Sequence, residues 1–247
     1  MERLRDRGRT QSRVGYGPRM AFGERWLNTL LPFVAASLPA APARVVELGC
    51  GPLGGFVPAL LASGYDATGV DRNAPAGREY RQADFERYAP AEPVAAIIAS
   101  RSLHHVGDLD DVLGQAAASL RPGGLMIVAE WEWERFDERT ARWCFDRLDG
   151  AEASERDWLQ RRRAGWLGSG TAWDAYFAAW ASGHGLHRAE HILAGLESRF
   201  EPVLCERGPY FYADLEGVAE QDEQAAIDAG EINGTGIRYV GALPAGR

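Results

Sequence analysis

A glycine-rich segment is the part of the chain best suited to hold a nucleotide-like ligand. Gly49, Gly51 and Gly54 form a G-x-G-x-x-G motif between an apolar, β-branched run at Arg44–Leu48 and a helical run at Phe56–Ala62. Glycines at these points permit a sharp turn and let a ligand lie against bare backbone. The motif alone does not distinguish a dinucleotide from other adenosine ligands, so the neighbouring residues must decide.

Three acidic side chains lie around this glycine loop. Glu47 precedes the first glycine by two residues, where a dehydrogenase normally carries an apolar residue, and its charge can balance a cationic ligand. Asp71 ends the second expected strand, a position that suits hydrogen bonds to ribose hydroxyls. Asp84, with Phe85 beside it, offers an acceptor for an adenine amino group and an aromatic face for the base. Three acids suit a sulfonium ligand better than a pyrophosphate.

Polar residues also follow the fourth and fifth expected strands. Ser100, His104 and His105 come after the fourth strand, and the fifth ends on Glu130. Because histidine titrates near neutral pH, His104 or His105 is a candidate general base, and Glu130 is a third candidate. The alternative is that the two histidines only shape the loop beside the ligand.

The elements that must position these residues alternate between strand and helix patterns. Strand-like runs occupy residues 44–48, 64–71, 80–84, 94–99 and 125–130, and helical runs occupy 21–36, 56–62 and 108–120. The near-continuous apolar character of the strands is typical of strands covered on both faces. This alternation predicts a parallel sheet with right-handed crossovers and helices on both sides. Residues 121–124 predict a tight turn before the fifth strand.

The second half of the chain changes character. Residues 134–197 become helical and rich in tryptophan, which predicts a helical insertion over one end of the sheet. We expect most of these tryptophans to pack in the core, with Trp131 and Trp133 favoured as substrate-binding residues because they follow the fifth strand. Residues 200–212 and 236–243 predict strands that flank a helix near 218–230.

Composition excludes several functions. All 27 basic residues are arginine, so a Schiff-base lysine and a P-loop lysine are both impossible. The net charge of -8 argues against a nucleic-acid partner. The apolar stretches are too short to span a membrane, and three widely spaced cysteines fit a cytoplasmic setting. His184, His187 and His191 include a pair four residues apart, a spacing that could bind a metal from one face of a helix. No further ligand group is evident, and we expect no bound metal.

As a set, the motifs resemble the class I S-adenosylmethionine-dependent methyltransferase family, particularly its small-molecule branch. The resemblance covers roughly Ala43–Trp131 and rests on the segments 45–51, 69–71, 83–84, 100–106 and 120–124, with 236–242 similar to the last strand of the family's antiparallel hairpin. It implies an α/β fold with a doubly wound, mostly parallel seven-stranded sheet, a C-terminal antiparallel hairpin and a helical cap insertion. It also implies one domain, divided into an arm and helix at 1–40, a cofactor-binding core at 43–131, the insertion at 134–197 and C-terminal strands at 200–247.

The resemblance assigns S-adenosylmethionine as the cofactor. The residues it implies around the methionine moiety are Gly49, Cys50, Gly51, Ser100 and His105, with Glu47 nearby; those around the ribose are Asp71 and Arg72, and those at the adenine are Asp84 and Phe85. Tyr16 in the leading segment is expected to close over the site and contact substrate.

The expected activity is methyl transfer to a small-molecule acceptor at oxygen or nitrogen. Two alternatives remain open at the level of sequence. One is a nicotinamide-dependent oxidoreductase that uses the same glycines, and the other is a non-catalytic protein of the same fold that uses its tryptophan-rich part to bind a partner. The oligomeric state is not predicted.

Overall fold

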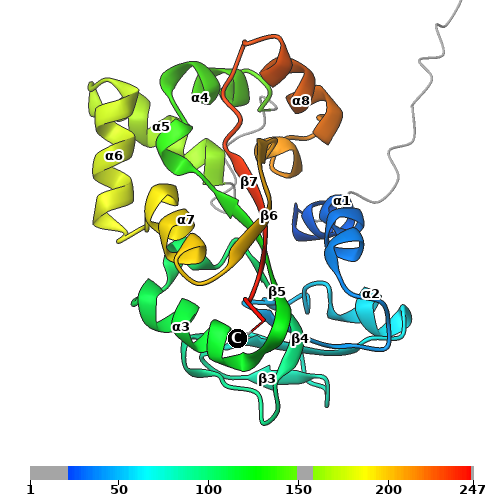
Figure 1. The fold of residues 1–247 in the computed structure, drawn as a ribbon. Helices are drawn as coiled ribbons and strands as arrows, with labels where there is room; N and C mark the ends of the chain where they lie inside the picture. The colour runs from blue at the N-terminus through cyan, green and yellow to red at the C-terminus, as the bar shows by residue number, and fades with distance from the viewer. Residues whose placement is uncertain (1–21, 149–157, 246–247) are drawn as a thin grey trace, which may run out of the picture.

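A single seven-stranded sheet forms the centre of the protein. The computed structural model describes residues 22–148 and 158–245 (Figure 1). The strands are β1 (Arg44–Leu48), β2 (Asp66–Asp71), β3 (Tyr80–Gln82), β4 (Val94–Ser100), β5 (Leu120–Trp131), β6 (Glu201–Gly208) and β7 (Gly236–Ala242). Their spatial order is β3-β2-β1-β4-β5-β7-β6, and β7 runs antiparallel to both β5 and β6. The expected fold class, with its C-terminal antiparallel hairpin, is confirmed.

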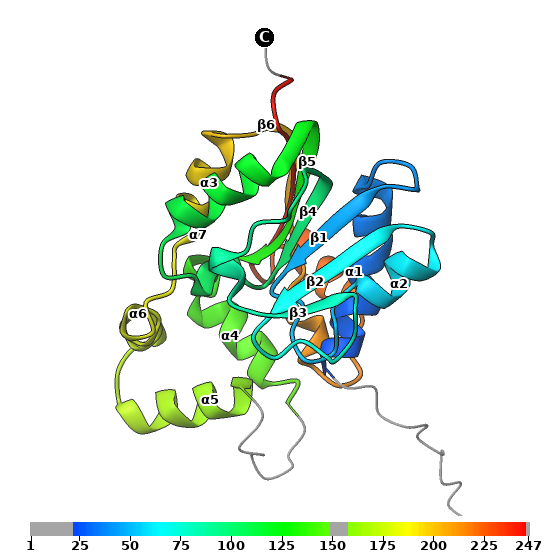
Figure 2. The same ribbon diagram turned by 90° about the horizontal axis from the view of Figure 1, so that it is seen from below.

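Helices cover both faces of this sheet. They are α1 (Phe22–Ser37), α2 (Val57–Ala62), α3 (Leu109–Ser119), α4 (Glu138–Phe145), α5 (Trp158–Ser169), α6 (Trp173–Gly183), α7 (Ala189–Glu197) and α8 (Glu220–Asp228), with short 3-10 turns η1 (Phe85–Arg87), η2 (Leu103–His105), η3 (Trp133–Arg135) and η4 (Phe211–Ala213). Figure 2 shows α1 and α2 on one side of the sheet and α3 and α7 on the other. Because side chains alternate along a strand, Val45 belongs to the core beneath α1 and α2 while Val46 belongs to the core beneath α3 and α7.

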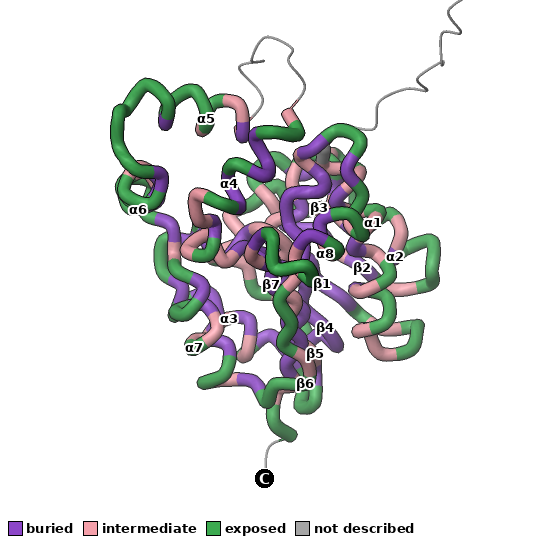
Figure 3. The backbone as a smooth tube through the Cα atoms, turned by 90° about the horizontal axis from the view of Figure 1, so that it is seen from above, coloured by how far each residue is buried: buried purple, intermediate pink, exposed green. Residues whose placement is uncertain are grey.

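The helices between β5 and β6 have two different roles. Helix α7 packs against α3, and its Ile192 and Leu196 belong to the core of the sheet. Helices α4, α5 and α6 extend past the sheet, and the tube view shows that much of α5 and α6 is exposed (Figure 3). Their inner faces bury an aromatic cluster in which Trp173 is fully buried and donates from Nε1 to the carbonyl of Phe136 at 2.6 Å. Core packing is therefore the role of Trp173.

Several expected boundaries differ from the structure, and two of these differences have a clear cause. The expected turn at 121–124 belongs to β5, because Gly123 and Gly124 exchange backbone hydrogen bonds with Leu243 beyond the end of β7. The strand expected over 200–212 ends at Gly208, since Pro209 has no N–H with which to continue the ladder. The aromatic residues that follow it turn into η4 instead. In the described ranges, none of the helices has the length and apolar character that membrane crossing demands.

Candidate functional site

The glycine loop brings the ends of three parallel strands together. The N–H of Gly49 donates to the carbonyl of Val70 at 2.8 Å, which fastens the end of β1 to β2. Gly49 has a φ of 81°, and a Cβ there would lie 2.7 Å from the Cβ of Ser102 in the loop after β4. Only glycine accommodates both the left-handed backbone and this close approach. The loop after β1 therefore presents bare backbone beside the loop after β4.

Glu47 lies beneath the glycine loop rather than on its open side. Its side chain is buried, and its Oε2 accepts a hydrogen bond from the N–H of Phe56 at 2.7 Å, at the start of α2. A Cβ on Gly55 would collide with this carboxylate, which explains why glycine is needed there as well. Burial raises the pKa of Glu47 to about 8, despite the backbone N–H groups of Phe56 and Val57. Cys50 is also buried, against Gly69.

Asp71 and Asp84 stand at the open edge of the sheet. Asp71 accepts hydrogen bonds from the N–H of Gly51 at 3.1 Å and of Asn73 at 2.7 Å, which holds its carboxylate against the glycine loop. Asp84 lies two residues beyond β3, caps η1 and pairs with the guanidinium of Arg72 at 2.6 Å. The hydrogen bond from Arg72 holds the pKa of Asp84 below its ordinary value.

A cleft of about 300 Å³ opens between these loops. Its lining consists of Gly49, Asp71, Arg72, Asn73, Asp84, Phe85, Glu86, Arg101, Ser102 and His105. Six of the ten predicted cofactor residues are thus brought together, whereas Glu47, Cys50, Gly51 and Ser100 do not line the cleft. Sequence reasoning missed Asn73, Glu86, Arg101 and Ser102, although all four lie within two residues of a predicted position.

The side chain of Ser100 is engaged elsewhere. Its hydroxyl accepts a hydrogen bond from Nε1 of Trp26 in α1 at 2.9 Å, which links the end of β4 to that helix. Ser102, two residues on, takes the place beside the glycine loop, and its hydroxyl donates to the carbonyl of Leu48 at 3.1 Å. Position along the loop, which the sequence pattern does not resolve, decides which serine faces the cleft.

His104 and Glu130 form a buried pair behind the cleft. Nδ1 of His104 lies 2.5 Å from Oε2 of Glu130, and both side chains are almost wholly buried. Oε1 of Glu130 also accepts the N–H groups of Ser102 at 2.8 Å and Leu103 at 2.6 Å, and Oε2 accepts the N–H of Trp131 at 3.0 Å. Burial opposes the charge on Glu130, but these partners outweigh it and lower its pKa. Neither side chain lines the cleft, and Glu130 instead holds the loop after β4 in place.

His105 is the histidine that faces the cleft. Its ring centroid lies 4.1 Å from that of His104. Part of His105 is exposed, but the atoms packed around its ring desolvate the ring. This desolvation, together with the neighbouring His104, lowers the pKa of His105 to about 4. His105 is therefore neutral at pH 7 and offers the cleft an uncharged ring.

Neither of the two tryptophans predicted to bind substrate lines the cleft. Trp131 is buried and stacks on Tyr210 with ring centroids 5.4 Å apart. Trp133 is half-buried and donates from Nε1 to the carbonyl of His187 at 3.0 Å. Tyr16, the third predicted substrate residue, lies outside the described residues.

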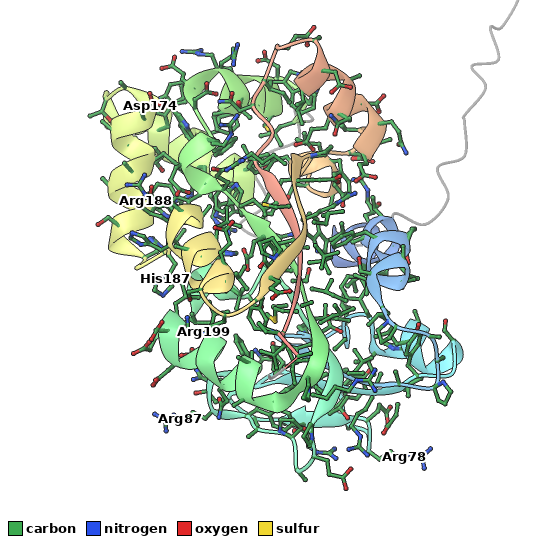
Figure 4. The ribbon with its side chains drawn as sticks, in the orientation of Figure 1. Arg78, Arg87, Asp174, His187, Arg188 and Arg199 are labelled. Carbon is green, nitrogen blue, oxygen red and sulfur yellow. The ribbon has the colours of Figure 1, made fainter. Side chains whose placement is uncertain are left out.

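The histidines near α7 have structural partners. His187 lies just before α7 (Figure 4). Its Nε2 lies 2.8 Å from the carbonyl of Val106, which ties the start of α7 to the loop after η2. Nδ1 of His184 lies 2.7 Å from the carbonyl of Trp180. Across residues 22–148 and 158–245, no three His, Cys, Asp or Glu side chains gather in a metal-binding arrangement.

Comparison with known proteins identifies the family of this chain. A profile of the methyltransferase domain family matches residues 20–178. Trans-aconitate 2-methyltransferase of Azoarcus sp. (strain BH72) is 36% identical over 98 residues, which are 35% of this chain and 38% of that protein. Ubiquinone biosynthesis O-methyltransferase of Bradyrhizobium sp. (strain ORS 278) is 30% identical over 107 residues, which are 38% of this chain and 42% of that protein. The matched part spans about two fifths of the length of each of these relatives.

Solved structures share the fold at low sequence identity. An S-adenosylmethionine-dependent methyltransferase from Mesorhizobium loti aligns with a TM-score of 0.53 and 19% identity, over 87% of this chain and 99% of that one. Geranyl diphosphate C-methyltransferase from Streptomyces coelicolor A3(2) aligns with a TM-score of 0.51 and 17% identity, over 89% of this chain and 76% of that one. Since the family profile covers more than half of the sequence, the chain belongs to the methyltransferase domain family, the S-adenosylmethionine-dependent enzymes that its glycine loop and strand-end acids resemble.

Proposed function

We propose that this chain transfers a methyl group from S-adenosylmethionine to the oxygen or nitrogen of a small-molecule acceptor. The observation that carries the proposal is the cleft itself, in which bare backbone at Gly49, the Asp71 carboxylate and the Asp84–Phe85 pair meet at the carboxyl edge of the sheet. Open α/β sheets bind ligands at this edge. Family membership disfavours the nicotinamide-dependent alternative.

The residues present fit an adenosine ligand that ends in a charged amino acid. Asp71 would accept from ribose hydroxyls, since a carboxylate has about four acceptor sites and the loop N–H groups take only two of them. Asp84 would accept from the adenine amino group while it stays paired with Arg72, and Phe85 would cover the ring. The methionine end would lie between Gly49 and Ser102, where the two loops approach each other.

The chain's own residues mainly bind, orient and exclude water. When bound, the cofactor supplies the electrophilic methyl group, so alignment with the acceptor supplies most of the remaining catalysis. We assign Glu130 and His104 to positioning the loop after β4, because the hydrogen bonds of the Glu130 carboxylate go to that loop, to His104 and to its own strand. His105 is the one candidate base of the three that lines the cleft. With a pKa of about 4 it is a weak base, which suits an acceptor that needs little deprotonation.

The acceptor side of the site belongs to this proposal as well. Trp131 would act on the acceptor indirectly, by holding Tyr210, on which it stacks, because Trp131 does not line the cleft.

The net charge of -8 supports a small acceptor over a nucleic acid. The three cysteines are all free, which supports a cytoplasmic setting.

Ligand-induced thermal stabilisation tests the cofactor. S-adenosylmethionine and S-adenosylhomocysteine at about 100 times their dissociation constants should stabilise the fold by about 2.7 kcal/mol and raise its melting midpoint by several degrees. NAD and NADP should leave the midpoint unchanged. A response to the nicotinamide nucleotides alone would overturn the proposal.

Two aspartates at opposite ends of β2 provide a matched pair of variants. Asp71→Asn removes a carboxylate from the cleft, and we expect it to weaken binding of S-adenosylhomocysteine about tenfold or more, through lost charge-assisted hydrogen bonds. Asp66→Asn changes the exposed residue at the start of the same strand and should bind like the unmodified chain. Equal affinities for the two variants in isothermal titration would contradict the assignment of Asp71.

A further inference from the structure

We propose that Glu223, in α8, is a positioning residue of the methyl-transfer site, because it holds the turn η4 whose flanking residues support Arg101 in the wall of the cleft. The inference rests on the proposed function, since it concerns binding of the cofactor's methionine end. Glu223 does not line the cleft, and it acts only through the residues that it holds. Its role changes no covalent bond.

Glu223 is a buried carboxylate that binds the backbone of one turn. Its side chain is fully buried. Oε1 accepts the N–H of Tyr210 at 2.9 Å and that of Phe211 at 3.1 Å, and Oε2 accepts the N–H of Tyr212 at 2.6 Å. Burial raises the pKa of Glu223 to about 7, despite these three donors. Because a buried carboxylate is costly unless donors surround it, Glu223 and this turn depend on each other.

A second charged side chain holds the same segment from α1. Arg25 donates to four carbonyls between Tyr212 and Val218. Glu223 therefore takes N–H groups at the start of the segment, and Arg25 takes carbonyls further along it. The turn η4 accordingly contacts both α1 and α8. Buried backbone groups need partners, and here two side chains supply them in place of a strand or a long helix.

The turn presents two groups to Arg101. The central guanidinium carbon of Arg101 lies 5.1 Å from the centre of the Tyr210 ring, and the guanidinium hydrogen-bonds to the Tyr210 side chain. Asp214 directly follows η4. Burial opposes the charge of Arg101, but Tyr210 and the carboxylates of Asp214 and Glu130 outweigh it and raise the pKa of Arg101. Since Glu223 binds the N–H of Tyr210 itself, a shift of the turn displaces partners of Arg101.

Arg101 needs this support because its backbone is unfavourable. Its φ is 56°, and it is the one non-glycine residue with a positive φ among those that the structure describes. Surrounding contacts must enforce a left-handed backbone in a residue that carries a side chain. Its N–H donates to the carbonyl of Ala129 at 2.8 Å, and its guanidinium packs against Trp26 as well as Tyr210. Arg101 lines the cleft next to Ser102, so loss of its partners would loosen the loop that faces the methionine end.

Isothermal titration with S-adenosylhomocysteine and with 5′-methylthioadenosine tests the inference. The second ligand keeps the adenosine but lacks the amino-acid end, so its binding should depend little on the loop beside Arg101. At pH 8, where most of the Glu223 carboxylate is ionised, we expect Glu223→Ala to weaken binding of S-adenosylhomocysteine about tenfold and that of 5′-methylthioadenosine less than about twofold. Glu223→Gln keeps one acceptor oxygen, enough for two of the three N–H groups, and should fall between.

Leu120→Ala is the matched control for lost stability. Leu120 is buried at the amino end of β5, at the edge of the sheet opposite the cleft. Its truncation should leave a cavity and lower the melting midpoint without touching η4. We expect this variant to bind both ligands like the unmodified chain. Far-ultraviolet circular dichroism checks that each variant is folded, and if Glu223→Ala fails this check, Glu223→Gln supplies the comparison.

Arg101→Lys tests whether Glu223 acts through Arg101. Lysine keeps the charge beside Asp214 and Glu130 but lacks the planar group that packs on two rings. We expect Arg101→Lys alone to weaken S-adenosylhomocysteine about threefold or more. In that background, Glu223→Ala should weaken it less than about threefold further, because both changes disrupt the same support and their effects are not additive.

Three results would overturn the inference. They are unchanged affinity of both Glu223 variants for S-adenosylhomocysteine, equal weakening of the two ligands, and full additivity of Glu223→Ala with Arg101→Lys. Each would show that Glu223 only stabilises the fold or acts by a route other than Arg101. Failure of the unmodified chain to bind S-adenosylhomocysteine would instead refute the proposed function, and this inference with it.

Discussion

Replacement of Glu130 by glutamine tests whether one buried carboxylate holds the loop that forms the cleft. An amide has one oxygen and one NH₂ group, so it can keep the two hydrogen bonds that Oε1 accepts from Ser102 and Leu103. The NH₂ group then faces the N–H of Trp131 and the ring of His104, the two partners of Oε2. Each hydrogen bond to a buried charge contributes about 1.5–3 kcal/mol. A change of His104 tautomer that lets Nδ1 accept from the NH₂ group would recover one of the two contacts. We therefore expect Glu130→Gln to lower the free energy of unfolding by about 2–5 kcal/mol.

Glu138 provides the matched control on the same chain. Its carboxylate also pairs with a cation, Arg142, at 2.5 Å, but the two side chains are 41% and 60% exposed. Because solvent screens such a pair, Glu138→Gln should cost less than about 1 kcal/mol. Equilibrium urea unfolding, followed by tryptophan fluorescence and far-ultraviolet circular dichroism, measures both variants against the unmodified chain. Equal costs for the two variants would refute the reasoning that burial makes Glu130 important.

The pH dependence of this difference gives a second test. The pKa of Glu130 is lowered in the folded chain, so its stabilisation is present above the ordinary glutamate pKa of 4.5 and is lost as the pH falls through the folded value. The gap between the unmodified chain and Glu130→Gln should therefore narrow below pH 4.5. A gap that stays constant down to the acid limit of folding would show that the charge of Glu130 contributes nothing.

Three further predictions concern other buried or partly buried groups. The pKa of Glu47 is raised from 4.5 to about 8, so the folded state binds a proton more tightly than the unfolded state. The free energy of unfolding should then fall by about 1.4 kcal/mol for each unit by which the pH rises between 4.5 and about 8. Urea unfolding at several pH values should show a smaller pH dependence for Glu47→Gln. Arg25 donates to four carbonyls between Tyr212 and Val218, at 2.6 to 3.3 Å. Arg25→Met should therefore lower the free energy of unfolding by about 2–3 kcal/mol. A loss below about 0.5 kcal/mol would show that water replaces these bonds. The NMR titration midpoint of His105 should lie near 4 rather than 6.5, and a midpoint above 6 would remove the reason to treat it as neutral.

Local patterns in the sequence were sufficient for the fold class and for six of the ten residues that line the cleft. Apolar runs of strand length, interrupted by helical runs, predict a parallel sheet whatever the details of packing, because strand and helix patterns have different periods. The positions of Asp71, at the end of β2, and of Asp84, two residues beyond the end of β3, were predicted to share one edge, since the carboxyl ends of parallel strands lie at the same edge of a sheet. Gly49 was identified because its neighbours in the chain mark a turn.

Tertiary structure alone decided which of the predicted side chains reach the cleft. Glu47 and Asp71 look alike in sequence, each an acid at or near the end of a strand, yet Glu47 is buried against the start of α2 while Asp71 faces the opening. Glu130 contacts Ser102, which is 28 residues away in the chain, and no local pattern reports such a contact. The placement of Arg101 depends on a backbone that neighbouring strands hold at an unfavourable φ and on two rings from α1 and the segment after β6. Periodicity specifies which elements form, but the direction of a side chain depends on partners that only the packed chain brings together.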